Sequence, residues 1–268
     1  MAYATSADGT RIAFERQGTG DAILLVHGTT GSTQAWALVI PHLLERFAVV
    51  AMDRRGHGQS EPGPTHTLDR LAEDVIAVID AVAEPVHLVG YSGGARAALA
   101  AAPRTQRLRS LVLYEPPIAV QHNPPDLPDR ADALIREGNR DAAAEAFLRE
   151  AACLPEDEIS TLKNIPPVWE RIMAGVHNGP LDQRAFMAAP VDLDAARRIT
   201  VPVLILLGSE QDAPVYLDGL DDLERALPNS RRAEIPRQRH MAPAFAPEEF
   251  ANAVATFLAE VGASEERG

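Results

Sequence analysis

Short apolar runs that end at glycine constrain this chain more than any other feature of its sequence. Three of them are bounded by glycine or proline, at 22–28 (AILLVHG), 86–90 (VHLVG) and 201–208 (VPVLILLG). Two further candidates lie at 47–53 and 110–115. Continuous aliphatic runs of this length are typical of strands that are buried on both faces, as in a parallel sheet. The runs therefore predict a central, mostly parallel sheet.

Helical patterns lie between the predicted strands. Residues 69–83 place Leu71 and Val75 on one face, with acidic residues near the start, where they suit the helix dipole. Residues 94–102 and 248–261 also have helical patterns. Because strands and helices alternate, we expect an α/β fold, with a doubly wound, mostly parallel sheet and helices on both of its faces.

The middle of the chain departs from this alternation. From Pro116 to Pro190 there is no strand pattern, only short helical patches separated by prolines. We therefore expect residues 118–191 to form a helical cap. This cap would be inserted into one core that comprises residues 1–117 and 192–268.

Composition limits the partners and the compartment. The 268 residues include 25 basic and 38 acidic side chains, a formal net charge of -13, so the surface repels phosphate backbones and no nucleic acid is expected. The one cysteine, Cys153, cannot form an intramolecular disulfide. The apolar runs are shorter than the roughly 20 residues that span a bilayer, and residues 1–18 have no signal-peptide pattern. We expect a soluble, cytoplasmic protein without a membrane partner, with a frayed tail at 262–268.

The strongest local motif is GYSGG at 90–94. It follows a predicted strand and precedes a helix of small residues at 95–102. Glycines at both ends allow Ser92 to sit on a tight strand-to-helix turn with its hydroxyl exposed, because a Cβ at Gly90 or Gly94 would crowd the neighbouring strand and helix. The alternative is a structural turn in which the serine caps the helix. The strand and helix on either side favour a nucleophile.

A serine hydroxyl becomes a good nucleophile only when a base takes its proton and a carboxylate orients that base. His240 lies just before the last predicted helix, and Asp212 follows the apolar run that ends at Leu207. The carboxyl ends of parallel strands converge on one crevice. We therefore expect Ser92, Asp212 and His240 to meet there.

Four stretches of the chain, taken together, resemble the α/β-hydrolase family. They are HGTTGS at 27–32, DRRGHGQS at 53–60, GYSGG at 90–94, and GSEQD at 208–212 with His240. They follow the family's order and cover nearly the whole chain. The resemblance implies a catalytic triad of Ser92, Asp212 and His240, an oxyanion hole formed by the backbone N–H groups of Thr29 and Gly93, and a helical cap.

No metal or cofactor is expected. The polar side chains of Asp53, Arg54 and His57 lie close together in the sequence, but their spacing does not match a metal site. We interpret this loop as a turn that is held by its own hydrogen bonds.

Two carboxylates are candidates for the acid of the implied triad. Three residues separate Gly208 from Asp212, one more than in many members of the family. Some relatives, notably the haloalkane dehalogenases, place the acid after the preceding strand, where this chain has Glu115. We expect Asp212 to be the acid and keep Glu115 as the alternative acid. The arginines of the loop 237–240 (RQRH) are expected to be surface charges.

These features predict a serine hydrolase that cleaves an acyl bond (ester, thioester or lactone) of a small molecule. Fold alone does not choose among the chemistries of such a family. A C–C bond hydrolase, a perhydrolase or a biosynthetic cyclase or lyase is therefore the alternative. A non-catalytic receptor for a small ligand is disfavoured, because the serine, acid and histidine are all present.

Overall fold

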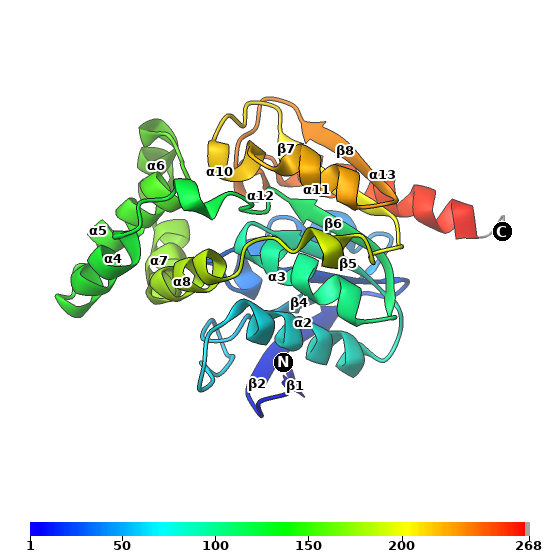
Figure 1. The fold of residues 1–268 in the computed structure, drawn as a ribbon. Coiled ribbons are helices and arrows are strands. Elements are labelled where there is room, and N and C mark those ends of the chain that lie inside the picture. Colours follow the sequence, from blue (N-terminus) through cyan, green and yellow to red (C-terminus); the bar gives the residue numbers. More distant parts are fainter. Residues whose placement is uncertain (266–268) are drawn as a thin grey trace.

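An eight-stranded sheet organises the computed structural model, which describes residues 1–265 (Figure 1). The spatial order of the strands is β1-β2-β4-β3-β5-β6-β7-β8. The pairs β1–β2 and β2–β4 are antiparallel, and the remaining pairs are parallel. The strands are β1 (Ala2–Thr5), β2 (Arg11–Gln17), β3 (Ala22–Val26), β4 (Ala48–Met52), β5 (Val86–Tyr91), β6 (Leu108–Tyr114), β7 (Val203–Gly208) and β8 (Ser230–Ile235). The predicted α/β fold class with a mostly parallel sheet is confirmed, and β1 and β2 add an antiparallel hairpin that was not predicted.

The helices follow the strands in alternation and then collect in one long insertion between β6 and β7. They are α1 (Ile40–Leu43), α2 (Leu68–Val82), α3 (Gly93–Ala101), α4 (Leu127–Arg136), α5 (Arg140–Ala146), α6 (Glu156–Lys163), α7 (Pro166–Gly175), α8 (Gly179–Ala188), α9 (Leu193–Ala196), α10 (Pro214–Leu217), α11 (Leu220–Ala226), α12 (Ala242–Phe245) and α13 (Pro247–Glu265). Residues 262–265, which we expected to fray, are helical, and residues 266–268 of that expected tail lie outside the described residues. Within residues 1–265, no helix combines the length and the hydropathy needed to cross a membrane.

Alternate residues of the buried strands face opposite helical layers. On β3, Leu24 and Val26 pack in one apolar cluster with side chains of α2 and α3. Their neighbours Ile23 and Leu25 pack in a second cluster with α1 and α13. Because successive side chains of a strand point to opposite faces, a strand covered on both faces must be apolar throughout. This explains why the strand runs in the sequence show no polar alternation.

The helical insertion between β6 and β7 has its own apolar centre. Side chains of α4 to α7, among them Leu127 and Trp169, form a cluster that is separate from the two clusters of the sheet. Helix α8 instead packs Phe186 into the cluster of α2 and α3. Figure 1 shows α4 to α8 grouped at one end of the sheet, at the left of the view. The insertion is therefore a separate layer that is fastened to the core through α8.

A buried ion pair joins this insertion to the core. Arg54, in the loop after β4, donates two hydrogen bonds to the carboxylate of Asp182 on α8, at 2.9 and 2.8 Å. The side chains are 1% and 0% exposed. Burial raises the pKa of Asp182, but the charge of Arg54 and a hydrogen bond with His66 outweigh it and hold that pKa well below its usual value. The carboxylate therefore stays charged inside the protein.

We expect Asp182→Asn to lower the free energy of unfolding by about 3–5 kcal/mol, because it leaves the Arg54 charge buried without its partner. The matched control is Asp194→Asn, whose carboxylate pairs with Arg197 on the surface and is 85% exposed. Removing such an exposed pair costs less than about 1 kcal/mol. Urea unfolding of the two variants measures the difference. Equal stabilities would contradict the role given to the buried pair.

Candidate active site

Ser92 sits in a strained turn between β5 and α3. Its backbone angles are φ 54° and ψ -122°, a combination that L-residues rarely adopt. Its N–H donates to the carbonyl of Tyr114 at 2.9 Å, and its carbonyl accepts from Ala95 at 2.8 Å. The side chain makes no capping hydrogen bond to α3. The backbone thus holds the turn, and the hydroxyl is not used as a helix cap.

The two flanking glycines allow this turn to pack closely. A Cβ on Gly90 would lie 2.6 Å from the Cα of Ala95, and a Cβ on Gly94 would lie 2.2 Å from the carbonyl oxygen of Val26. Both distances are shorter than any normal contact, so strand and helix approach as closely as the sequence motif suggested.

Gly93 follows Ser92 in the chain, and Thr29 lines the same cavity as Ser92. Gly93 is the first residue of α3, and the N–H groups of the first helical turn have no partner within the helix. The carbonyl of Gly28 accepts from His27 Nδ1 at 2.7 Å. In a trans peptide the C=O and N–H groups point in opposite directions, so the N–H of Thr29 is turned away from His27. Gly28 itself packs on Ser92, since a Cβ there would lie 3.3 Å from the Ser92 Cβ.

Glu115 is the carboxylate that meets His240. Its Oε2 accepts from His240 Nδ1 at 2.7 Å. It also accepts from the backbone N–H of Gly208 at 2.8 Å and from the side-chain amide of Gln211 at 2.6 Å. Glu115 is completely buried, so these three donors replace the water that its carboxylate has lost. Because a carboxylate only accepts, Nδ1 of His240 carries the proton and Nε2 keeps its lone pair.

Asp212 lies elsewhere. Its Oδ1 accepts from Arg239 at 2.6 Å, and its side chain is 77% exposed. The loop after β7 does reach the site, but through Gly208 and Gln211, which donate hydrogen bonds to the Glu115 carboxylate. The geometry therefore departs from the expectation for Asp212 and matches its alternative, Glu115.

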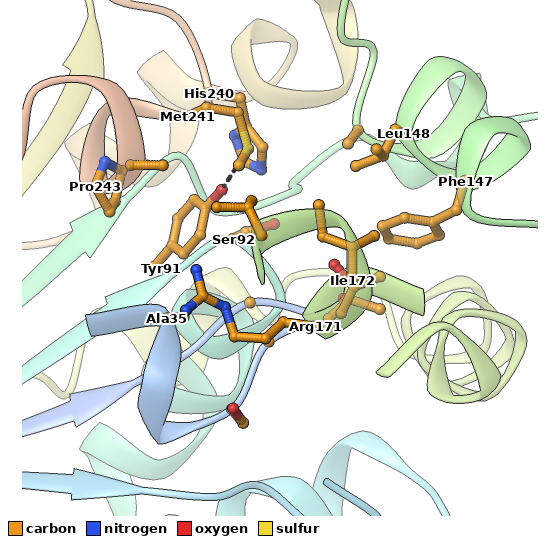
Figure 2. Close-up of a pocket in the computed structure, with 18 residues that line it drawn as sticks. Ala35, Tyr91, Ser92, Phe147, Leu148, Arg171, Ile172, His240, Met241 and Pro243 are labelled. Carbon is orange, nitrogen blue, oxygen red and sulfur yellow. Dashed lines mark hydrogen bonds between the residues drawn. The ribbon is translucent and has the colours of Figure 1, made fainter. Parts of the chain in front are cut away.

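Three tyrosines surround the His240 ring. The ring of Tyr216 stacks on it with centroids 4.6 Å apart and an interplanar angle of 20°. Tyr91 lies at 5.0 Å and Tyr114 at 6.5 Å. Burial raises the pKa of each of these three phenols, so all three stay protonated and can donate hydrogen bonds. Tyr91 donates to the sulfur of Met241 at 3.2 Å (Figure 2). The three tyrosine rings thus hold the His240 ring from several sides.

Ser92 and His240 line one cavity of about 90 Å³ between the core and the insertion (Figure 2). The core also contributes Tyr91 and residues of the loop after β3, and the insertion contributes mostly apolar side chains. The lining residues are Gly28, Thr29, Thr30, Gly31, Ser32, Ala35, Tyr91, Ser92, Phe147, Leu148, Ala152, Val168, Arg171, Ile172, His240, Met241, Pro243 and Ala244. The cavity thus presents a serine hydroxyl, an imidazole and mainly apolar walls.

No group of three or more His, Cys, Asp or Glu side chains is arranged to hold a metal ion in the part of the chain that the structure describes. In the loop 53–60, Asp53 and Ser60 instead make hydrogen bonds within the loop and to the backbone of Thr33. Asp53 accepts from the backbone N–H groups of Thr33 at 2.7 Å and Gln59 at 2.9 Å, and Ser60 donates to the Asp53 carbonyl at 2.6 Å. The polar residues of this loop are therefore structural.

Comparisons with known proteins agree with this architecture. The family model described as "Alpha/beta hydrolase family" matches residues 23–253. The structure of an α/β hydrolase from Sphaerobacter thermophilus DSM 20745 is 31% identical, with a TM-score of 0.84, and the match covers 96% of this chain and 100% of that one. A thermophilic esterase from Thermogutta terrifontis is 27% identical, with a TM-score of 0.79, over 97% of this chain and 98% of that one. Among the curated proteins, the bifunctional esterase/perhydrolase DCH of Acinetobacter calcoaceticus is 30% identical over 91% of this chain and 94% of its own length. The chain belongs to the α/β-hydrolase family.

Three residues of the site were missed by the sequence analysis. Gln211 holds the Glu115 carboxylate, Tyr216 stacks on the histidine, and Arg171 lines the cavity. Gln211 lies within the stretch 208–212 that resembles the family, and its neutral amide gave no signal beside two acidic residues. Arg171 could not be placed from the sequence, because the direction in which its side chain points depends on how the insertion packs.

Buried His57 should make stability depend on pH. Burial and the charge of Arg54 lower the pKa of His57 from 6.5 to about 4. Between pH 6.5 and 4 the folded protein thus keeps this histidine neutral, while the unfolded chain protonates it. The contribution of His57 to the free energy of unfolding is therefore complete above pH 6.5. It declines by about 1.4 kcal/mol per pH unit as the pH falls toward 4. Urea unfolding at several pH values should show a shallower decline for His57→Gln than for the unchanged protein. The same slope in both would contradict this prediction.

Proposed function

We propose that this protein is a serine hydrolase that cleaves the acyl bond of a small ester, thioester or lactone. One observation carries the proposal: Ser92, on its strained turn, shares a cavity with His240, whose Nδ1 is held by buried Glu115. A serine, a histidine with a free Nε2 and an orienting carboxylate form the set that activates a hydroxyl for attack on an acyl carbon. The esterases among the relatives support the same chemistry.

In the first half of the reaction, His240 Nε2 takes the proton of the Ser92 hydroxyl while its oxygen attacks the acyl carbon. Glu115 accepts from Nδ1 throughout, which keeps the ring in the required tautomer and stabilises the imidazolium that forms. His240 then gives its proton to the departing alcohol or thiol. This leaves the acyl group on the serine oxygen.

The negative charge that develops on the acyl oxygen needs donors that are already in position. We assign this role to the backbone N–H groups of Gly93 and Thr29. Both residues lie beside Ser92, and a Cβ on Gly93 would come within 2.4 Å of the Thr29 hydroxyl oxygen. Removing one such donor typically slows an acyl transfer by about 10²–10³-fold.

Water completes the cycle. His240 removes a proton from a water molecule, whose oxygen attacks the acyl carbon, and the serine leaves with that proton. The cavity, at about 90 Å³, is smaller than the engineered cavity of about 150 Å³ that accepts benzene. We therefore propose short acyl groups, with residues 118–191 acting as a cap that excludes bulk solvent.

Perhydrolysis is a second candidate, favoured by the relative that is both esterase and perhydrolase. Here hydrogen peroxide, in place of water, attacks the acyl carbon, and the product is a peracid. The same serine and histidine serve both reactions. Assaying peracid formation with and without peroxide separates the two candidates.

Ser92→Ala should reduce the hydrolysis of short esters by roughly a million-fold while the fold stays intact, because it removes the nucleophile. A fluorophosphonate probe should label the unchanged protein and fail to label this variant. Ser32→Ala is the matched control, since Ser32 lines the same cavity and should leave both labelling and turnover in place. Labelling or turnover of Ser92→Ala at the wild-type level would contradict the proposed function.

A further inference from the structure

We propose that Arg171 makes this site selective for esters that carry a carboxylate. This inference rests on the proposed function and adds a substrate class to it. The guanidinium would bind the substrate's carboxylate while Ser92 attacks the ester carbon. Arg171 has no part in the proposed chemistry, and no other formally charged side chain is among the residues that line the cavity.

The position of α7 brings Arg171 over the loop that follows β3. Gly175, one helical turn later, packs on this loop, since a Cβ there would lie 2.5 Å from the Thr30 carbonyl oxygen. Residues four apart lie on the same face of a helix, so Arg171 faces the same loop. It lines the cavity together with the hydroxyl-bearing residues Thr30 and Ser32. In Figure 2 its guanidinium extends in the direction of Ala35 and Tyr91, on the core side of the cavity.

The charge of Arg171 has no partner among residues 1–265, where its guanidinium makes no hydrogen bond, ion pair or ring contact. Three other arginines of the insertion, Arg130, Arg149 and Arg184, are matched with acids. Arg184 pairs with Asp129 and Asp132. A cation that is partly removed from water without a partner is unfavourable, and a bound anion relieves that cost. The unmatched charge therefore points to a ligand.

The chemistry of the ligand follows from the guanidinium and its surroundings. Its planar fork of N–H donors matches the two oxygens of a carboxylate. The cap side of the cavity is apolar, with Phe147, Leu148 and Ile172, and no carboxylate of the protein lines it. Although the whole protein carries a formal charge of -13, the cavity's own formal charge is positive. A short ester with one carboxylate fits both the apolar walls and the cation.

The test compares acidic esters with neutral ones of the same shape. Monoethyl succinate places the carboxylate in the acyl part, and 4-acetoxybutanoate places it in the alcohol part. Each is measured against its own amide, in which the carboxylate becomes a neutral carboxamide. We expect kcat/KM to favour the acid over its amide by about 10- to 100-fold for at least one of the two pairs, the range for a hydrogen bond to a charged group.

Variants assign this preference to Arg171. Arg171→Gln should bring the acid-to-amide ratio of kcat/KM close to one, whereas Arg171→Lys should keep part of the preference. Arg140→Gln is the matched control, because it makes the same change in net charge at an exposed position that does not line the cavity. It should keep the full preference. The same acid-to-amide ratio in the unchanged protein and in Arg171→Gln would overturn the proposal.

A binding measurement separates this inference from the proposed hydrolysis. In Ser92→Ala, which cannot form an acyl-enzyme, calorimetry should show that monoethyl succinate binds about 10- to 100-fold more tightly than its amide, and that Arg171→Gln abolishes the difference. Absence of ester turnover in the unchanged protein, with this binding preference intact in Ser92→Ala, would count against the hydrolase and not against the anion site. Equal binding of acid and amide would overturn the anion site, whatever the turnover.

Discussion

The hydrogen bond between the buried carboxylate of Glu115 and His240 Nδ1 is the interaction on which the rest of the site depends. The register of the sheet places Glu115 beside Ser92. Tyr91, the last residue of β5, pairs with Tyr114, the last residue of β6. Ser92 and Glu115 follow directly, so the proposed nucleophile and the proposed acid emerge from neighbouring strands. The third strand, β7, and the loop after it contribute two donors to this buried carboxylate, the backbone N–H of Gly208 and the side-chain amide of Gln211.

The buried ion pair of the insertion couples the cap to the same region. The backbone N–H of Arg54 donates to His27 Nε2 at 3.0 Å, while its guanidinium holds Asp182 of α8. A Cβ on Gly93 would lie 3.3 Å from both the Arg54 guanidinium and the Asp182 carboxylate. The attachment of the cap and the proposed oxyanion hole are thus parts of one packed unit. The same attachment holds α7 above the loop after β3, where Arg171 enters the cavity.

The strands, the insertion and the turn at Ser92 could be predicted because their signals are local: apolar runs, clustered prolines and a glycine on each side of a serine. The carboxylate that contacts His240 could not be predicted. Glu115 and Asp212 follow neighbouring strands, and the packing of the loops decides which of the two turns inward. Glu115 adopts a positive φ of 44°, and Gln211 faces the site while Asp212 faces solvent. The polar hairpin of β1 and β2 was missed because it lacks the apolar runs of buried strands.

The most direct test of this account compares kcat for Glu115→Gln with kcat for Asp212→Asn, using a short ester and checking each fold by urea unfolding. Glu115→Gln should lower kcat by about 10⁴-fold, the loss seen when the orienting carboxylate of such a triad becomes an amide. Asp212→Asn should change it by only a few-fold, because it breaks a surface pair worth less than about 1 kcal/mol. A large loss in Asp212→Asn with near wild-type activity in Glu115→Gln would contradict the account.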